Sequence, residues 1–257
     1  MLAKTFYGME KLLSKELKKL GATNVNEGNR LVYFSGDKGF MYKANLCLRN
    51  ALKILKPIYN FQAVNDLALY EKLFNFQWND FLSPDQTFAI DCVVHGDVFT
   101  HSLYTSQRCK DAIVDRFKKD FGKRPSVDKR NPDIRLHLHI FDEKCNLSLD
   151  TSGRSLHHRG YRSLTNIAPI NEVLAAGIIQ SSGWEERTDF VDPMCGSGTF
   201  LIEAAMMACK IPANLNRKDF AFEKWEDWDQ TLFKKIKTSQ LNRVISPVGK
   251  IYGFDKA

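Results

Sequence analysis

The sequence predicts an α/β protein whose N-terminal half is mixed α+β. Two observations carry this prediction. Over the first 150 residues, short apolar runs with strand character alternate with segments whose apolar residues have helical spacing. Near residue 190, a short apolar run ends at an acidic residue, and a loop with two glycines and an apolar helix follow. Strand, tight glycine loop and helix in that order form the first half of a βαβ nucleotide-binding unit.

The first sixty residues predict a β-α-β-α-β order. Leucines with helical spacing and lysines between them mark the first helix, which Gly21 ends. The elements are expected at residues 2–7, 8–20, 31–34, 38–49 and 52–64. So many elements in so short a stretch favour a small ferredoxin-like domain, and we assign residues 1–64 to it.

Residues 65–152 predict a second mixed block with an excess of basic residues. Its elements are expected at residues 66–82, 87–94, 102–121, 134–141 and 145–150. Between residues 101 and 165 there are fourteen Lys and Arg against eight Asp and Glu. This excess favours a polyanionic partner, although a solvated helix face explains any single lysine equally well. His137 and His139 share one strand face, and without further ligands we expect surface histidines rather than a metal pair.

Residues 153–168 read as a basic linker punctuated by glycines. A bare tether is one interpretation. The segment also places Tyr161 between Arg159 and Arg162, and arginine planes and tyrosine rings bind phosphates and stack on unpaired bases. A helix is expected from Ala168-Pro169 onward, packed through Ile170, Val173 and Leu174.

The glycine loop at residues 192–199 does not match the common phosphate loops. It lacks the third glycine of the dinucleotide fingerprint, because Leu201 stands there, and it lacks the lysine of a P-loop. Asp192 before the glycines suits a cationic or hydroxylated ligand better than a pyrophosphate. Downstream, residues 250–255 predict a second strand that ends at Asp255, where an acid can bind ribose hydroxyls. A helical insertion over residues 216–246 separates the two strands.

The sequence of residues 192–205, D-P-M-C-G-S-G-T-F-L-I-E-A-A, resembles motif I of class I S-adenosylmethionine-dependent methyltransferases. It is most similar to RNA methyltransferases with a THUMP domain, in particular the large-subunit rRNA guanine-N2 type. The stretches Y-T-S-Q-R-C-K-D-A-I-V-D and R-P-S-V-D resemble a THUMP domain, whose boundary in the family can begin near residue 44, and L-H-H-R-G-Y-R resembles the lead into the catalytic domain. Residues 169–257 would then be the first part of a Rossmann-like methyltransferase domain.

The resemblance implies S-adenosylmethionine as cofactor and RNA as partner. The implied cofactor residues are Asp192, Pro193, Cys195, Gly196, Ser197, Gly198, Thr199 and Asp255. The implied RNA-binding residues are Arg108, Lys110, Arg124, Lys129, Arg130, Arg154, Arg159, Tyr161 and Arg162.

Family members continue into an Asn-Pro-Pro-aromatic motif that holds the amino group to be methylated, and this sequence has no such motif. We therefore expect a partial methyltransferase domain that is inactive as given, with its catalytic residues unassigned. The favoured function is methylation of guanine N2 in large-subunit rRNA. Guanine-N2 methylation of tRNA and RNA binding without catalysis stay open as alternatives.

The composition agrees with a folded protein outside membranes. The chain is 44% hydrophobic, which is normal for globular proteins, and its net charge is +7 with a pI near 9.0. The six cysteines form no C-x-x-C pair, which favours free thiols in a reducing compartment. No signal peptide or membrane-spanning run is recognisable. We expect a cytoplasmic protein without a membrane or metal partner.

Overall fold

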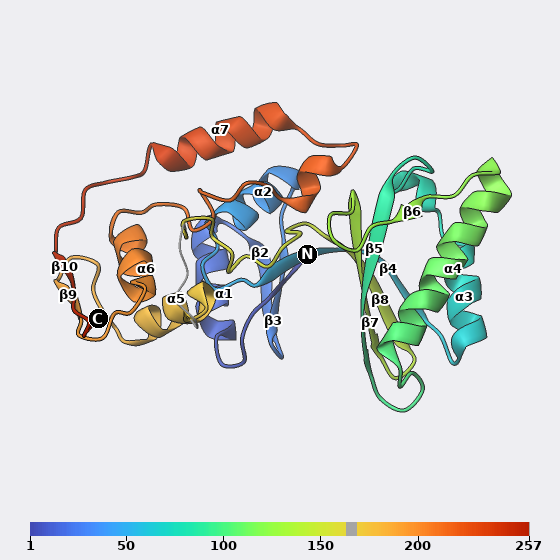
Figure 1. The fold of residues 1–257 in the computed structure, drawn as a ribbon, viewed down its shortest axis with the longest axis horizontal. Coiled ribbons are helices and arrows are strands. Elements are labelled where there is room, and N and C mark those ends of the chain that lie inside the picture. The colour runs from blue at the N-terminus through green and yellow to red at the C-terminus, as the bar shows by residue number, and fades with distance from the viewer. Residues whose placement is uncertain (163–168, 257) are drawn as a thin grey trace. The chain divides into compact units, whose positions relative to one another are not determined.

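The computed structural model of the protein describes residues 1–162 and 169–256 and divides into two compact units (Figure 1). The first unit comprises Met1–Ile54, Arg154–Phe220 and Asp229–Ala257. The second comprises Leu55–Gly153 and Ala221–Trp228. The end of the predicted linker, residues 163–168, lies outside the described residues, as does Ala168 at the expected helix start.

The N-terminal part of the first unit has the β-α-β-β-α-β order of a ferredoxin-like domain. Its elements are β1 (Leu2–Lys4), α1 (Glu10–Leu20), β2 (Thr23–Gly28), β3 (Leu31–Ser35), α2 (Lys38–Cys47) and the beginning of β4 (Lys53–Gln62). Strand β3 lies between β1 and β2 and is antiparallel to both. Leu13 and Leu17 of α1 are buried, which confirms the predicted leucine stripe, and Gly21 ends the helix at a φ of 104°.

The remainder of the first unit carries the glycine loop. It contains α5 (Glu172–Ser181), β9 (Phe190–Asp192), α6 (Thr199–Ala208), α7 (Gln230–Leu241) and β10 (Ile251–Gly253). Strands β9 and β10 pair in parallel, with Asp192 opposite Gly253. Helices α5 and α6 pack together through Ala176, Ile179, Ala204 and Met207. The predicted strand-loop-helix unit is therefore present, and its two strands are short.

The second unit is an αβ layer in which α3 and α4 cover one face of a sheet (Figure 1). The strand order is β4-β8-β7-β5-β6. Its elements are α3 (Asp66–Phe74), the 3₁₀ turn η1 (Trp78–Asp80), β5 (Thr87–His95), α4 (Ser102–Phe121), β6 (Ser126–Val127), β7 (Ile134–Phe141), β8 (Lys144–Asp150) and the 3₁₀ turn η2 (Ala221–Lys224). Strands β5 and β7 are parallel, while β7 and β8 form an antiparallel hairpin.

Two expectations need correction. His137 is buried with 5% of its surface exposed, so it is no surface histidine. The predicted helix over residues 66–82 is in fact α3 followed by a separate turn at Trp78, whose indole N–H donates to the Leu73 carbonyl oxygen at 2.7 Å. Within residues 1–162 and 169–256 no group of three His, Cys, Asp or Glu side chains could hold a metal ion, and no helix there is long and apolar enough to cross a membrane.

Candidate functional site

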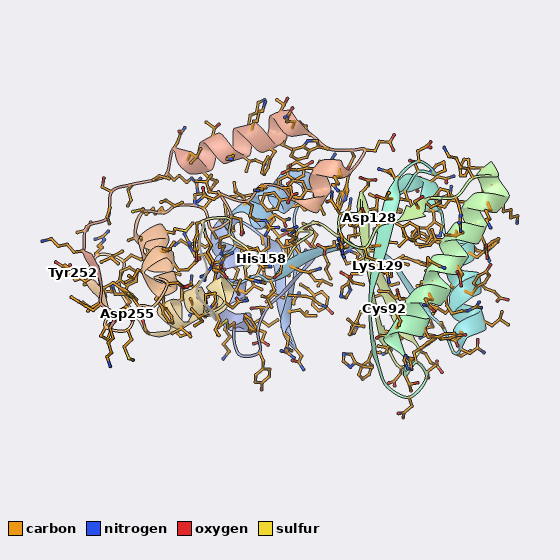
Figure 2. All side chains as sticks on the ribbon, viewed as in Figure 1. Cys92, Asp128, Lys129, His158, Tyr252 and Asp255 are labelled. Atoms are coloured by element: carbon orange, nitrogen blue, oxygen red, sulfur yellow. The ribbon has the colours of Figure 1, made fainter. Side chains whose placement is uncertain are left out.

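The glycine loop is held by backbone hydrogen bonds that continue the β9–β10 pairing. Phe254 N–H donates to the Asp192 carbonyl oxygen at 2.9 Å, and Cys195 N–H donates to the Phe254 carbonyl oxygen at 2.9 Å. The next amide, that of Gly196, donates to Asp255 Oδ2 at 2.6 Å. Asp255 lies beside the paired strands in Figure 2. The chain after β10 thus closes over the loop that follows β9.

Two glycines give this loop a backbone conformation that other residues rarely adopt. Gly196 and Gly198 have φ values of 50° and 75°, in the left-handed region that favours glycine. A Cβ added at Gly196 would meet no atom within 4 Å, and one at Gly198 only Leu201 Cδ1 at 3.9 Å. Gly198 is also the N-cap of α6, whose first amides have no intrahelical partner. A side chain at either glycine would therefore project into open space beside a helix N-terminus.

The two predicted acidic residues differ in their surroundings. Asp192 Oδ1 accepts a hydrogen bond from Met194 N–H at 3.1 Å. Its Oδ2 is buried and has no hydrogen-bond partner among residues 1–162 and 169–256. Such a buried acceptor costs free energy until a donor reaches it. Asp255 is exposed and already accepts from Gly196, and its role toward ribose stays a prediction.

The side chain of Arg162 connects the glycine loop to the start of α5 through hydrogen bonds. Its Nε donates to Glu172 Oε1 at 2.6 Å, and its Nη2 donates to Thr199 Oγ1 at 2.8 Å and to the Ile170 carbonyl oxygen at 3.1 Å. Its Nη1 donates to Ser197 Oγ at 3.3 Å. The planar guanidinium thus spans two predicted cofactor residues and a carboxylate that is itself buried. We assign Arg162 to positioning of the loop, because these internal contacts occupy four of its five N–H donors.

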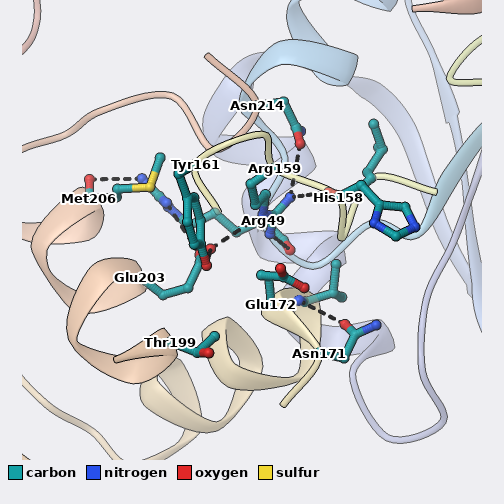
Figure 3. Close-up of polar contacts among 12 residues, drawn as sticks. Arg49, His158, Arg159, Tyr161, Asn171, Glu172, Thr199, Glu203, Met206 and Asn214 are labelled. Carbon is teal, nitrogen blue, oxygen red and sulfur yellow. Dashed lines mark hydrogen bonds and ion pairs between the residues drawn. The ribbon is translucent and has the colours of Figure 1, made fainter. Parts of the chain in front are cut away.

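Arg159 is the clearest correction to the predicted RNA contacts, because it is 1% exposed. Its Nε donates to Glu203 Oε1 at 3.4 Å, and its Nη2 donates to the Arg49 carbonyl oxygen at 2.6 Å. Asn214 Oδ1 accepts from Nη1 at 3.2 Å. Figure 3 shows these groups converging from three parts of the first unit. A buried arginine enclosed in this way cannot reach an RNA phosphate, so the residue holds the fold together instead.

Glu203 on α6 is the common acceptor of this buried cluster. It is 0% exposed and lies 3.8 Å from Arg49 Nη1 through its second oxygen, while Tyr161 Oη donates to its first oxygen at 3.2 Å. Burial and the nearby Glu203 carboxylate raise the pKa of Tyr161, so its hydroxyl stays a donor. Arg49 Nη2 also donates to the Met206 and Ile211 carbonyl oxygens at 2.9 and 2.5 Å. None of Arg49, Glu203 and Asn214 was singled out from the sequence.

The other predicted RNA-binding residues lie at or near the surface. Arg108 stacks over the Tyr70 ring at 4.8 Å, and Lys110 pairs with Asp111 at 2.7 Å. Exposed positions are taken by Arg124, Lys129, Arg130 and Arg154. Lys129 is labelled in Figure 2. Lys110 and Lys129, together with Arg135, line a cleft of about 330 Å³ in the second unit. These positions are open to a polyanion, and their contact with RNA stays a prediction.

The fold and the loop by themselves define a class of protein: a ferredoxin-like domain, a mixed αβ domain, and the beginning of a Rossmann-like domain with a motif I loop. Three family models match in the same order. They are the RlmL ferredoxin-like domain over residues 1–55, the THUMP domain over residues 65–150, and the RMKL-like methyltransferase domain over residues 159–257.

Solved structures agree with this order of domains. The protein SMU.472, whose crystal structure was determined in complex with SAH, shares 30% sequence identity with this chain at a TM-score of 0.88. The chain covers 68% of its length. A "possible methylase" from Clostridium difficile 630 is 31% identical with a TM-score of 0.87 and 67% covered. A "predicted N6-adenine-specific DNA methylase" from Listeria monocytogenes is 29% identical with a TM-score of 0.89 and 67% covered. The matches include 100%, 99% and 100% of this chain, respectively.

The chain therefore belongs to the RlmL-like family of THUMP-containing, S-adenosylmethionine-dependent methyltransferases. It carries the ferredoxin-like domain, the THUMP domain and part of the methyltransferase domain, and it spans about two thirds of the length of these three proteins.

The bend between Arg159 and Tyr161 yields a testable prediction. Gly160 has a φ of 86°, and a Cβ there would lie 2.1 Å from the Asn216 carbonyl oxygen, whereas Gly8 has a φ of 84° with no atom within 4 Å of a Cβ. Gly8→Ala should cost about 1–2 kcal/mol for the left-handed conformation. Gly160→Ala should cost about 1–3 kcal/mol more, because backbone must move. Urea unfolding of both variants measures the difference, and equal losses would contradict the close approach of Asn216.

Proposed function

We propose that this chain is part of an RNA methyltransferase that transfers a methyl group from S-adenosylmethionine to guanine N2 of large-subunit rRNA. The observation that carries the proposal is the presence, in one chain, of a THUMP domain and a motif I loop with an unsatisfied buried carboxylate oxygen. Methyl transfer from labelled S-adenosylmethionine to rRNA tests it. The assay uses the full-length protein, with base analysis of the product.

The loop residues fit the cofactor that the family uses. Asp192 Oδ2 is a buried acceptor without a donor in the described part of the chain, and the surfaces at Gly196 and Gly198 are open to a close ligand. Residues 192–199 would hold the cofactor, with Asp255 on its ribose. S-adenosylmethionine supplies a methyl group activated on a sulfonium centre. The protein's part is to position the two reactants and to exclude water, since such a displacement gains mainly from orientation.

The chain contributes to this positioning through rigid supports. Arg162 fixes Ser197 and Thr199 against Glu172, and the Gly196 amide is fixed by Asp255. A preset loop loses little conformational freedom when a ligand arrives, which favours affinity. The RNA would bind through the basic surface of the second unit, where Lys110, Lys129 and Arg135 line one cleft.

The base that is methylated has an alternative assignment. The similar Listeria protein is described as acting on N6 of adenine in DNA, while the sequence resemblance points to guanine N2 in rRNA, with tRNA as an alternative RNA. A THUMP domain in this chain favours RNA over DNA. Base analysis after labelling separates these candidates, because N2-methylguanine and N6-methyladenine are distinct products. RNA binding without methyl transfer by the chain as given would support the alternative that this polypeptide is an RNA-binding module.

A glycine substitution tests the cofactor assignment. Gly198→Val should weaken binding of S-adenosylhomocysteine by more than about tenfold, because a branched side chain would stand where the ligand approaches. Gly183→Val is the matched control. Gly183 has a φ of 74° against 75° for Gly198, and a Cβ added at Gly183 would meet no atom within 4 Å. Calorimetric titration gives both affinities. Tight ATP binding by the unmodified chain with no response to S-adenosylhomocysteine would refute the assignment.

Charge substitutions test the RNA surface. Lys129→Ala with Arg130→Ala should weaken RNA binding, and the slope of log K against log salt should fall by about one for each phosphate that the variant no longer neutralises. Lys234→Ala with Lys235→Ala, on exposed positions of α7, is the control of equal charge. Filter binding at several salt concentrations measures the slopes. Identical slopes for the two double variants would contradict a role of Lys129 and Arg130 in RNA binding.

A further inference from the structure

A second cavity lies in the first unit, away from the glycine loop. Its volume is about 800 Å³, and its walls come from α1, the end of α5, the segment after α6 and the end of α7. Met207 and Lys210 line it at the C-terminal end of α6, whereas the glycine loop lies at the N-terminal end. A helix of ten residues separates its two ends by about 15 Å. The cavity is therefore a site of its own, and its size suits a ligand as large as a nucleotide.

Cations predominate around this cavity. Lys15, Lys19, Lys210 and Arg243 line it in exposed positions, and none of their side chains has an ion pair or hydrogen bond within the part of the chain that the structure describes. Arg49 also lines the cavity, but it is buried and its charge is already matched by Glu203, so it is not counted among these unpaired cations. Unpaired cations around a concavity attract an anion, since the surrounding low-dielectric walls concentrate their field.

Little negative charge offsets these cations. The lining acids are Glu16 and Glu186. Glu16 is already occupied, because its carboxylate accepts from Arg49 N–H at 3.2 Å and Asn50 N–H at 3.0 Å. Cys47 adds none, because burial raises the pKa of its thiol to about 12. An anionic ligand would thus meet more attraction than repulsion.

A buried amide also faces the cavity. Gln240 lines it and is 8% exposed, and its side chain makes no hydrogen bond among residues 1–162 and 169–256. An amide offers both donors and an acceptor, the combination that reads the edge of a nucleobase. Leu12, Ile211 and Ile245 supply apolar wall that can cover the faces of a planar ring.

We propose that this cavity is a nucleotide-binding site, in which the lysines and Arg243 hold the phosphate and Gln240 reads the base. The chemistry is the same whether the nucleotide belongs to an RNA strand or is a free mononucleotide. The site is distinct from the cofactor loop, and the inference does not depend on the proposed methyl transfer.

The test measures binding of guanosine 5′-monophosphate, a short single-stranded oligoribonucleotide and inorganic phosphate to the chain by calorimetry. Lys19→Ala and Gln240→Leu should each weaken nucleotide binding about tenfold, since a hydrogen bond to a charged or buried group is removed. Lys18→Ala is the matched control, because Lys18 is exposed on the same helix and does not line the cavity. It should change affinity less than about twofold. Circular dichroism checks that each variant folds.

Several outcomes separate the possibilities. Saturable binding of the mononucleotide supports a free ligand, and binding of the oligoribonucleotide alone supports an RNA strand. Absence of binding by all three probes overturns the proposal, as do equal losses for Lys18→Ala and Lys19→Ala. Saturating S-adenosylhomocysteine should leave nucleotide binding unchanged. Displacement by it would move the nucleotide to the cofactor loop and overturn the second site, whereas failure of S-adenosylhomocysteine to bind would affect only the proposed function.

Discussion

The carboxylate of Glu203 must be matched by cations inside the protein, and much of the first unit follows from this requirement. Leaving water costs a carboxylate several kcal/mol, which is recovered only with close partners in good geometry. Arg159 provides the nearer partner at 3.4 Å, and Arg49 the farther one at 3.8 Å. Arg49 follows α2 of the ferredoxin-like domain, and Glu203 lies on α6 of the methyltransferase domain. The buried charges therefore connect the two domains.

This connection reaches the cofactor loop because α6 begins where the loop ends. The stretch from Arg159 to Arg162 runs beside the helix and is attached at two levels, through Glu203 and through Thr199 at the first turn. If the loop binds the cofactor as proposed, the affinity depends also on Arg162 and Glu203, which hold the loop and its helix in place. A segment that resembles an RNA-binding linker in sequence thus becomes a support for the loop in the structure.

The sequence predicted the elements with clear apolar periodicity, including α1, α4 and the strand-loop-helix unit, while the role of the loop in cofactor binding stays a prediction. It did not reveal β2 (Thr23–Gly28), because this edge strand has no buried residue and hence no alternating pattern. It also misplaced Arg159, since a basic, glycine-rich stretch normally lies in solvent and its partner is 44 residues away. One signal was available: Glu203 is the single charged residue of a largely apolar helix rich in Ala and Met, and a buried carboxylate needs a cation.

A double-mutant cycle on Arg159 and Glu203 tests the central role of this pair most directly. Arg159→Met, Glu203→Gln and the double variant are unfolded in urea, and the same cycle is run on the surface pair Arg116–Asp120 with Arg116→Met and Asp120→Asn. We expect each buried single change to cost about 3–5 kcal/mol and the coupling energy to exceed about 1 kcal/mol. The surface pair should couple by about 0.3–0.5 kcal/mol. Additive effects at Arg159 and Glu203 would contradict the account.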